Sequence, residues 1–263
     1  MSRATRRPPA LVLLAATIAV LFVALPLIGI VERAHWSTVW ADLTTGETRS
    51  ALRLSLVCSL SAAGLSILFG TPLAWVLART TFPGRSLVRG LVLLPMVLPP
   101  VVGGVALLAA FSRNSPVGGW FDDVLGVQFT FTTAGAVLAE TFVALPFYVI
   151  TVEGALRSMD QRYEDAAASL GAGRYTVFRR VTLPLIAPSV AAGAVLAWAR
   201  ALGEFGATIT FAGNVAGETR TLPLAVYLEL ESDRNAAVAL SLVLVVVSLG
   251  VIVSLRDRWF IRT

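Results

Sequence analysis

Residues 164–185 read EDAAASLGAGRYTVFRRVTLPL and lie between two long hydrophobic runs. The stretch is too long and too rich in helix-forming residues to be a simple turn. Just before it, Asp160 can cap a helix with the body QRYEDAAASL, and Gly171 stands where a left-handed residue is preferred after a helix. We therefore predict a short helix within the connection between two hydrophobic segments.

One face of this predicted helix is apolar and small in its middle. Its members recur at i, i+3, i+4 and i+7 spacing and are Tyr163, Ala166, Ala167 and Leu170. A second amphipathic piece, RYTVFRRV, groups Tyr175, Phe178 and Val181 ahead of Pro184. A helix lying on lipid fits this pattern almost as well as a docking helix. The alanines favour docking into a protein groove, because a lipid-seeking face prefers Leu, Phe and Trp.

The composition identifies a membrane protein. Of the 263 residues, 56% are hydrophobic and 14% are charged, and the mean hydropathy is +0.79. A soluble domain carries about 25% charged residues, and about 20 consecutive apolar residues cross a hydrocarbon core as a helix. The run 10–31 lacks a convincing cleavage site and is predicted to be a retained span. We predict one all-α transmembrane domain over residues 1–263 with six spans, at about 10–31, 54–78, 90–111, 132–152, 186–211 and 236–255.

Arginine is distributed unevenly between the connections. All 21 basic residues are Arg, and 14 of them lie in residues 1–9, 79–89, 157–185 and 256–263. Six lie in residues 32–53, 112–131 and 212–235. Cytoplasmic connections carry the excess of positive charge, so both termini and the loops 79–89 and 157–185 are predicted to be cytoplasmic. The sequence pI of about 10.3 could indicate a nucleic-acid partner, but the arginines follow this orientation bias and are not gathered on one soluble face, so we expect no such partner.

Two predicted spans carry features that are unusual in lipid. The sequence LLPMVLPPVVGG at 93–104 places three prolines in the third span, where freed backbone groups need a neighbour or a cavity. Glu140 and Glu153 lie in and near the fourth span. For the prolines, as for the carboxylates, a structural role and a place along a transport pathway both fit.

The fifth predicted span contains opposite charges. Arg200 and Glu204 are one helical turn apart and can pair, and Thr208 continues the same stripe. A neighbouring stripe of small residues suits close helix packing and consists of Ala199, Gly203 and Ala207. Each charge at a helix centre costs about 2.5–3.5 kcal/mol on insertion scales, so such residues usually face the bundle interior. A structural ion pair and a pathway or gate role are both consistent with this pattern.

The loop quoted first resembles the cytoplasmic EAA loop of ABC-importer permeases. That pattern is Glu-Ala-Ala, three residues, Gly, nine residues and Ile-x-Leu-Pro. Here it reads Asp165-Ala166-Ala167, then Gly171, then Val181-Thr182-Leu183-Pro184, with Asp in place of Glu and Val in place of Ile. The resemblance covers about residues 50–255. It implies a type I ABC-importer permease fold in which this loop is the coupling helix that sits in a cleft of the ATP-binding subunit.

The segment ARALGEFGATITFAGN at 199–214, followed by TLPLAVY at 221–227, is similar to molybdate-importer permeases. Sulfate permeases carry a related version, more often with Tyr after the Glu, so Phe205 favours molybdate. The resemblance implies a permease of the bacterial cytoplasmic membrane without a cofactor of its own. Its implied partners are a second copy of the chain, two cytoplasmic ATP-binding subunits and an extracytoplasmic oxyanion-binding protein.

Other classes of function are less consistent with the residues. The chain has no GxGxxG or GxxxxGK[ST] signature, so we expect it not to bind ATP itself. With one Cys, one His and no Lys, it offers no metal cluster and no catalytic pair for an intramembrane hydrolase. A sulfate or tungstate permease is the nearest alternative. An ion-driven carrier that uses Arg200 and Glu204 is a more distant one, because such a carrier has no ATPase to dock.

Overall fold

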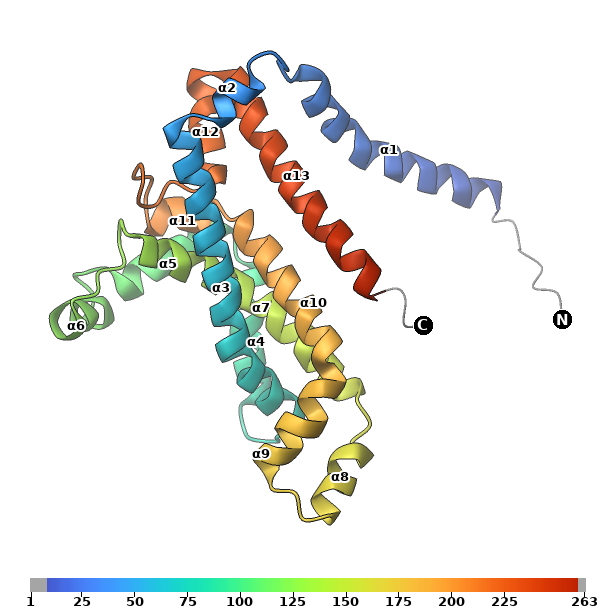
Figure 1. Ribbon diagram of the computed structural model, residues 1–263. Helices are drawn as coiled ribbons and strands as arrows, with labels where there is room; N and C mark the ends of the chain where they lie inside the picture. Colours follow the sequence, from blue (N-terminus) through green and yellow to red (C-terminus); the bar gives the residue numbers. More distant parts are fainter. Residues whose placement is uncertain (1–8, 260–263) are drawn as a thin grey trace.

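The computed structural model describes residues 9–259, with side chains up to residue 250, and the predicted cytoplasmic positions of the chain ends lie outside the described residues. Every regular element in this part of the chain is a helix (Figure 1). The elements are α1 Ala10–Arg33, α2 Val39–Leu43, α3 Gly46–Arg79, α4 Arg85–Val97, α5 Pro100–Phe111, α6 Pro116–Leu125, α7 Thr133–Ser158, α8 Arg162–Ser169, α9 Arg174–Val177, the π-helical turn η1 Phe178–Thr182, α10 Leu183–Leu202, α11 Gly206–Phe211, α12 Leu222–Ser232 and α13 Arg234–Trp259.

The core of the bundle is formed by α3, α7 and α10, which pack along one another. Tyr148 of α7 is fully buried at their centre, and its hydroxyl lies 2.6 Å from Thr71 Oγ1 of α3. A Cβ atom at Gly70 of α3 would lie 2.6 Å from Cδ1 of this ring, and one at Gly193 of α10 would lie 3.1 Å from Cδ2. Glycine on both neighbouring helices therefore makes room for the tyrosine ring.

Four helical segments among the described residues are long and apolar enough to cross a membrane. They are α1, α3, α7 and the continuous segment Arg174–Leu202. The predicted spans 10–31, 54–78 and 132–152 are confirmed as single helices, and α13 covers the predicted span 236–255. The total of six spans, and the side of the membrane on which the ends lie, stay predictions.

The third predicted span, 90–111, is wrong as a single helix. It is divided into α4 and α5 by Leu98 and Pro99, both of which have extended backbone, with ψ of 138° and 133°. A residue that precedes proline is driven out of the helical region by contact with the proline ring, and here two prolines follow Leu98 in succession. The expected kink is a complete break.

The fifth predicted span, 186–211, is also corrected. Its helix begins earlier, because α9, η1 and α10 run continuously from Arg174, so the predicted second piece of the loop is not a separate helix. It ends earlier as well, at Leu202, and α11 begins only at Gly206. The predicted stripes along this span are therefore distributed over two helices.

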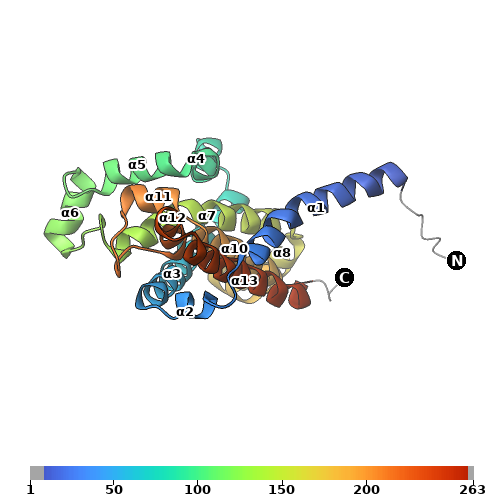
Figure 2. The ribbon, with the colours of Figure 1, turned by 90° about the horizontal axis from the view of Figure 1, so that it is seen from above.

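Different short helices lie at the two ends of the bundle. In Figure 1, α8 and α9 lie at one end, and α2 and α12 lie at the other. Seen from above in Figure 2, α4, α5 and α6 lie along one side, while α1 extends away from the bundle on another. None of the residues of α1, which the structure describes in full, is buried.

Candidate functional site

The predicted loop helix is present as α8. The predicted N-cap at Asp160 is wrong by one residue, because the N-cap of α8 is Gln161 and it makes no side-chain capping bond. Asp160 lies one position earlier, and its Oδ1 accepts a hydrogen bond of 3.0 Å from the backbone N–H of Arg162, the first residue of the helix. Gly171 has φ of +85°, in the left-handed region, as predicted. Its N–H donates to Ala168 O at 2.9 Å, and the N–H of Ala172 donates to Ala167 O at 3.1 Å. These two bonds form a Schellman motif, which satisfies the last carbonyl groups of a short helix.

The apolar face predicted for α8 is largely free of the rest of the chain. Leu170 is 89% exposed and Tyr163 is 58% exposed, and no residue of this fully described helix is buried. Asp165 and Ala166 are exposed, and Ala167 is half-buried. An exposed face with small residues in its middle can receive a second protein surface at close range.

Glu164, which the sequence did not single out, is the residue that connects α8 to the bundle. Its Oε1 accepts a hydrogen bond of 2.6 Å from Thr182 Oγ1 of η1. Its Oε2 lies 3.1 Å from Arg79 Nε, at the last residue of α3. No local pattern predicts a contact between residues so far apart in the chain, so only the fold could identify it.

The end of the predicted EAA pattern lies at the start of α10. Leu183 and Pro184 are its first two residues and directly follow the π-helical turn η1. Proline has no N–H with which to continue a regular hydrogen-bond ladder, and π-helical turns accommodate such irregularities. Thr182, the last residue of η1, is buried, whereas Pro184 is exposed.

The predicted pairing of Arg200 and Glu204 is present, with Arg200 Nη2 2.6 Å from Glu204 Oε2. Glu204 is buried and follows the end of α10. Its other carboxylate oxygen, Oε1, accepts a hydrogen bond of 2.9 Å from the N–H of Ala207 in the first turn of α11. Glu204 therefore pairs with the arginine that precedes the break and caps the helix that follows it.

Thr208, predicted to continue the same stripe, belongs to α11 and is fully buried. The predicted ridge of small residues is interrupted, because Gly203 follows the end of α10 and Ala207 lies in α11. The close packing is instead between α11 and α5. A Cβ atom at Gly104 would lie 2.9 Å from Ala207 O, and one at Gly206 would lie 2.9 Å from Pro100 Cβ.

The two glutamates of α7 have different surroundings. Glu153 interacts with Arg89 of α4, and its Oε1 also lies 3.0 Å from Arg157 Nε one turn along α7. These contacts favour the structural reading of Glu153. Glu140 is buried, and its Oε2 has no hydrogen-bond partner among the described residues.

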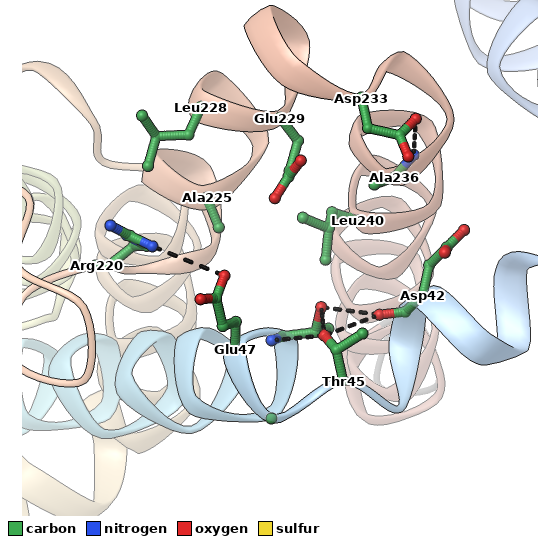
Figure 3. A pocket seen from close by; sticks show the side chains of 12 residues that line it. Asp42, Thr45, Glu47, Arg220, Ala225, Leu228, Glu229, Asp233, Ala236 and Leu240 are labelled. Carbon is green, nitrogen blue, oxygen red and sulfur yellow. Dashed lines mark hydrogen bonds and ion pairs between the residues drawn. The ribbon is translucent and has the colours of Figure 1, made fainter.

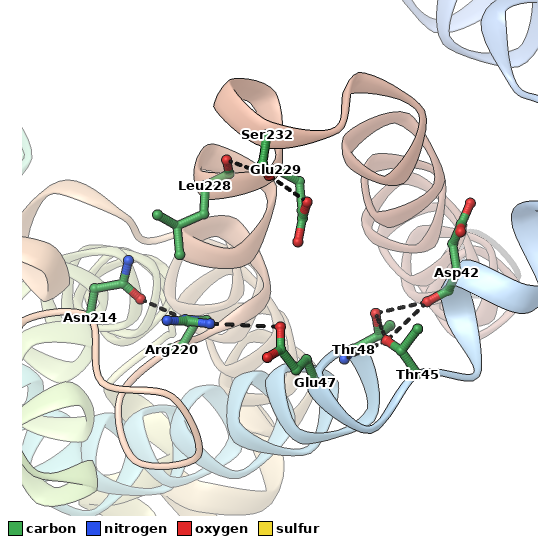
Figure 4. Close-up of polar contacts among 9 residues, drawn as sticks. All are labelled: Asp42, Thr45, Glu47, Thr48, Asn214, Arg220, Leu228, Glu229 and Ser232. Atoms are coloured by element: carbon green, nitrogen blue, oxygen red, sulfur yellow. Dashed lines mark hydrogen bonds and ion pairs between the residues drawn. The ribbon is translucent and has the colours of Figure 1, made fainter.

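A pocket of about 550 Å³ lies at the opposite end of the molecule from α8, between α2, the start of α3, α12 and α13 (Figure 3). Four carboxylates are among the described residues that line it, those of Asp42, Glu47, Glu229 and Asp233. Arg220 also lines it but is engaged, with Nη1 3.9 Å from Glu47 Oε2 and Nε donating to Asn214 Oδ1 at 3.0 Å (Figure 4). With four carboxylates and one arginine that is already paired, the pocket is unfavourable for binding a small anion.

Among the described residues, no three His, Cys, Asp or Glu side chains lie together in an arrangement that could hold a metal ion. Two other features could serve a function. One is α8, a helix that projects from the bundle, and the other is the ion pair of Arg200 and Glu204 at the break between α10 and α11. Neither provides a nucleophile paired with a base.

Comparison with known proteins gives these features a context. The family model described as "Binding-protein-dependent transport system inner membrane component" matches residues 70–263. The chain is 49% identical over 255 residues to the molybdenum transport system permease protein ModB of Mycobacterium tuberculosis, covering 97% of this chain and 96% of that protein. It is 36% identical over 240 residues to the sulfate transport system permease protein CysT of Escherichia coli, covering 90% and 86%.

A solved structure shares the fold. It is that of a bacterial ABC transporter involved in the import of the acidic polysaccharide alginate, with a TM-score of 0.74 and 23% sequence identity. The match covers 96% of this chain and 94% of that chain. The all-helical fold of an ABC-importer permease, as expected from the EAA pattern, is confirmed.

Proposed function

Because the chain belongs to the family of binding-protein-dependent transport system inner membrane components, we propose that it is the permease subunit of an ATP-driven importer that carries molybdate across the cytoplasmic membrane. The observation that carries the choice of cargo is the similarity, along almost the whole chain, to a molybdenum permease. The predicted ion-driven carrier finds no support in this family. A sulfate permease is the second candidate, because the sulfate relative also matches most of the chain.

The proposed complex contains two copies of this chain, two cytoplasmic ATP-binding subunits and an extracytoplasmic oxyanion-binding protein. One of the solved ABC transporters that share the fold is in complex with a substrate-bound periplasmic protein, which supports the binding-protein partner. The chain itself would supply the path across the membrane and a docking surface. ATP hydrolysis would belong to its partners.

We propose α8 as the docking surface for the ATPase. Its apolar face is exposed, its alanines permit a close approach, and its end at Gly171 is fixed by the Schellman motif. Residues Asp165, Ala166, Ala167, Gly171, Leu183 and Pro184 make up the proposed coupling loop. In alternating access, ATP-driven closure of the ATPase pair would move the two α8 helices together and open the pathway outward.

Arg200, Glu204 and Thr208 are the proposed pathway or gate residues. They lie in and beside the break between α10 and α11, and buried charges at helix breaks are frequent along transport pathways. We propose six spans, with α4 and α5 together as the third and with the α8 end of the bundle in the cytoplasm. The excess of arginine at that end supports this orientation.

The test is uptake by the whole complex. The chain is co-expressed with candidate ATPase and binding-protein partners encoded beside it, purified and reconstituted into liposomes, and uptake of labelled molybdate is measured with and without ATP. We expect ATP-dependent uptake that unlabelled tungstate competes with more strongly than sulfate does. Uptake of sulfate in preference to molybdate would support the second candidate, and the absence of a co-purifying ATPase would contradict the importer.

A further inference from the structure

The attachment of α8 to the bundle depends on few side chains. A groove of about 440 Å³ separates α8 from the end of α3, and its lining includes Trp75, Arg79, Gln161, Glu164, Ala168 and Thr182. Within the described part of the chain, Glu164 is the only residue of α8 whose side chain makes a polar contact with another helix. The carboxylate of Glu164 thus bridges the groove in two directions, to η1 and to α3.

Both contacts of Glu164 are shielded from water. The side chain of Arg79 is 8% exposed and that of Glu164 is 18% exposed. Thr182, which donates to the other carboxylate oxygen, is buried. Removing one partner of a shielded ion pair costs far more than removing one partner of a surface pair, because a charge is left without compensation. The loss of either partner should therefore weaken the attachment of α8 more than the loss of an exposed ion pair would.

A hydrogen bond and an ion pair, both made by arginines of α4, connect α3, α4 and α7 near this end of the bundle. Arg85, at the start of α4, donates to the carbonyl oxygen of Leu77 near the end of α3. Arg89, one turn further along α4, contacts Glu153 of α7. The ends of α3, α4 and α7 on the α8 side are thus linked by charged groups.

We propose that Glu164 is a positioning residue that transmits movement of α8 to α3 and to the start of α10. This inference rests on the proposed function, in which α8 meets the ATPase. Glu164 touches neither the cargo nor ATP. It sets the distance between the docking helix and the helices that move. Without it, α8 still forms, since the hydrogen bond to Asp160 and the Schellman bonds are local, but it moves across the groove without moving the bundle.

The test compares four variants of the reconstituted complex with the wild type, namely Glu164→Gln, Arg79→Gln, the double change to Gln and the exchange Glu164→Arg with Arg79→Glu. The control is Glu231→Gln, an exposed carboxylate on α12 at the other end of the bundle. Membrane abundance, co-purified ATPase, ATP hydrolysis and molybdate uptake are measured on each. The decisive quantity is the number of ATP molecules hydrolysed per molybdate imported. A purely structural role would lower hydrolysis and uptake together and leave this ratio unchanged.

We expect the wild type and the Glu231→Gln control to hydrolyse the same number of ATP molecules per molybdate imported. Glu164→Gln should assemble with the ATPase and hydrolyse ATP but raise the ratio about tenfold, within the usual range of coupling between two sites. The double Gln variant should be no worse than either single variant, and the exchange should restore part of the coupling. An unchanged ratio in Glu164→Gln, or independent losses that multiply in the double variant, would overturn the inference.

If the single variants reach the membrane in reduced amounts, the exchange variant decides the matter. Recovery of abundance and of the ratio supports the link between the two residues, and failure to recover either one refutes it. A wild-type complex that imports no molybdate with ATP would instead refute the proposed function, and that measurement is made first.

Discussion

Gly171 ends α8 with φ of +85°, and a Cβ atom at this position would meet no other atom within 4 Å. Replacement by another residue therefore causes no steric overlap within the chain, and its cost is that of the left-handed backbone, about 1–2 kcal/mol. That energy bears on the last turn of an exposed helix, outside the buried core of α3, α7 and α10. Gly171→Arg should therefore insert into the membrane in normal amounts.

The arginine should act on docking. Its long charged side chain would stand next to Leu170, which is 89% exposed on the face that we propose to meet the ATPase. Gly171→Asn and Gly171→Ala separate this effect from backbone strain, since Asn tolerates the left-handed region and Ala adds strain without bulk. We expect Asn and Ala to keep most of the uptake of molybdate, and Arg to lose either assembly with the ATPase or uptake.

Gly84 provides a matched control. It caps α4 with φ of +84°, its Cβ position is also open, and by the arginine bias it lies on the same side of the membrane. Gly84→Arg carries the same strain and the same charge in another loop, so assembly and uptake should persist. Normal assembly with normal uptake in Gly171→Arg would falsify the docking role of α8. Equal loss of membrane protein in Gly171→Ala and Gly171→Arg would show that Gly171 acts in folding.

Three further predictions concern the rest of the chain. A reporter active only in the cytoplasm should work when fused to the C terminus and fail when inserted near Val215, and the opposite pattern would refute the proposed orientation. Glu204→Ala should reduce uptake and stability more than a double change that also replaces Arg200 by Met. The reason is that the single variant leaves Arg200 without its partner, at a cost of about 3–5 kcal/mol for a buried pair. Equal uptake and stability of the two variants would contradict the importance of the ion pair. Gly104→Ala should lower the thermal stability of the purified protein, because the new Cβ would lie 2.6 Å from Thr210 Cβ, whereas Gly154→Ala, with open space around its Cβ, should not.

The features that the sequence predicted correctly are set by local chemistry. The apolar runs 10–31, 54–78 and 132–152 each lie in a single helix, and Asp160 and Gly171 flank α8 with hydrogen bonds to their own neighbours in the chain. The pairing of Arg200 with Glu204 is also local, because one helical turn separates them. In each case the residues that decide the structure lie within a few positions of one another.

The features that the sequence missed depend on contacts between distant segments. The prolines indicated a kink between α4 and α5, but we predicted the segment 186–211 to be one continuous span. The sequence GEFG at 203–206 carried a weak signal for the break after Leu202, since two glycines flank an acid whose carboxylate can accept from the start of the next helix. Glu164 gave no signal at all, since its partner Arg79 ends a helix much earlier in the chain.

The break between α4 and α5 and the break between α10 and α11 lie next to each other in the structure. A broken helix in a bilayer exposes backbone groups that lipid cannot satisfy, so it persists only where protein supplies partners or a cavity admits water. Here Glu204 satisfies an N–H at the start of α11, and the half-helices α5 and α11 approach each other so closely that Gly104 and Gly206 have no room for a side chain. Each break thus lies against the other, and a shift of one half-helix must displace its neighbour. Two half-helices that move as a pair, next to a buried ion pair, have the arrangement that a gate requires, which is why we place the proposed gate at Arg200, Glu204 and Thr208.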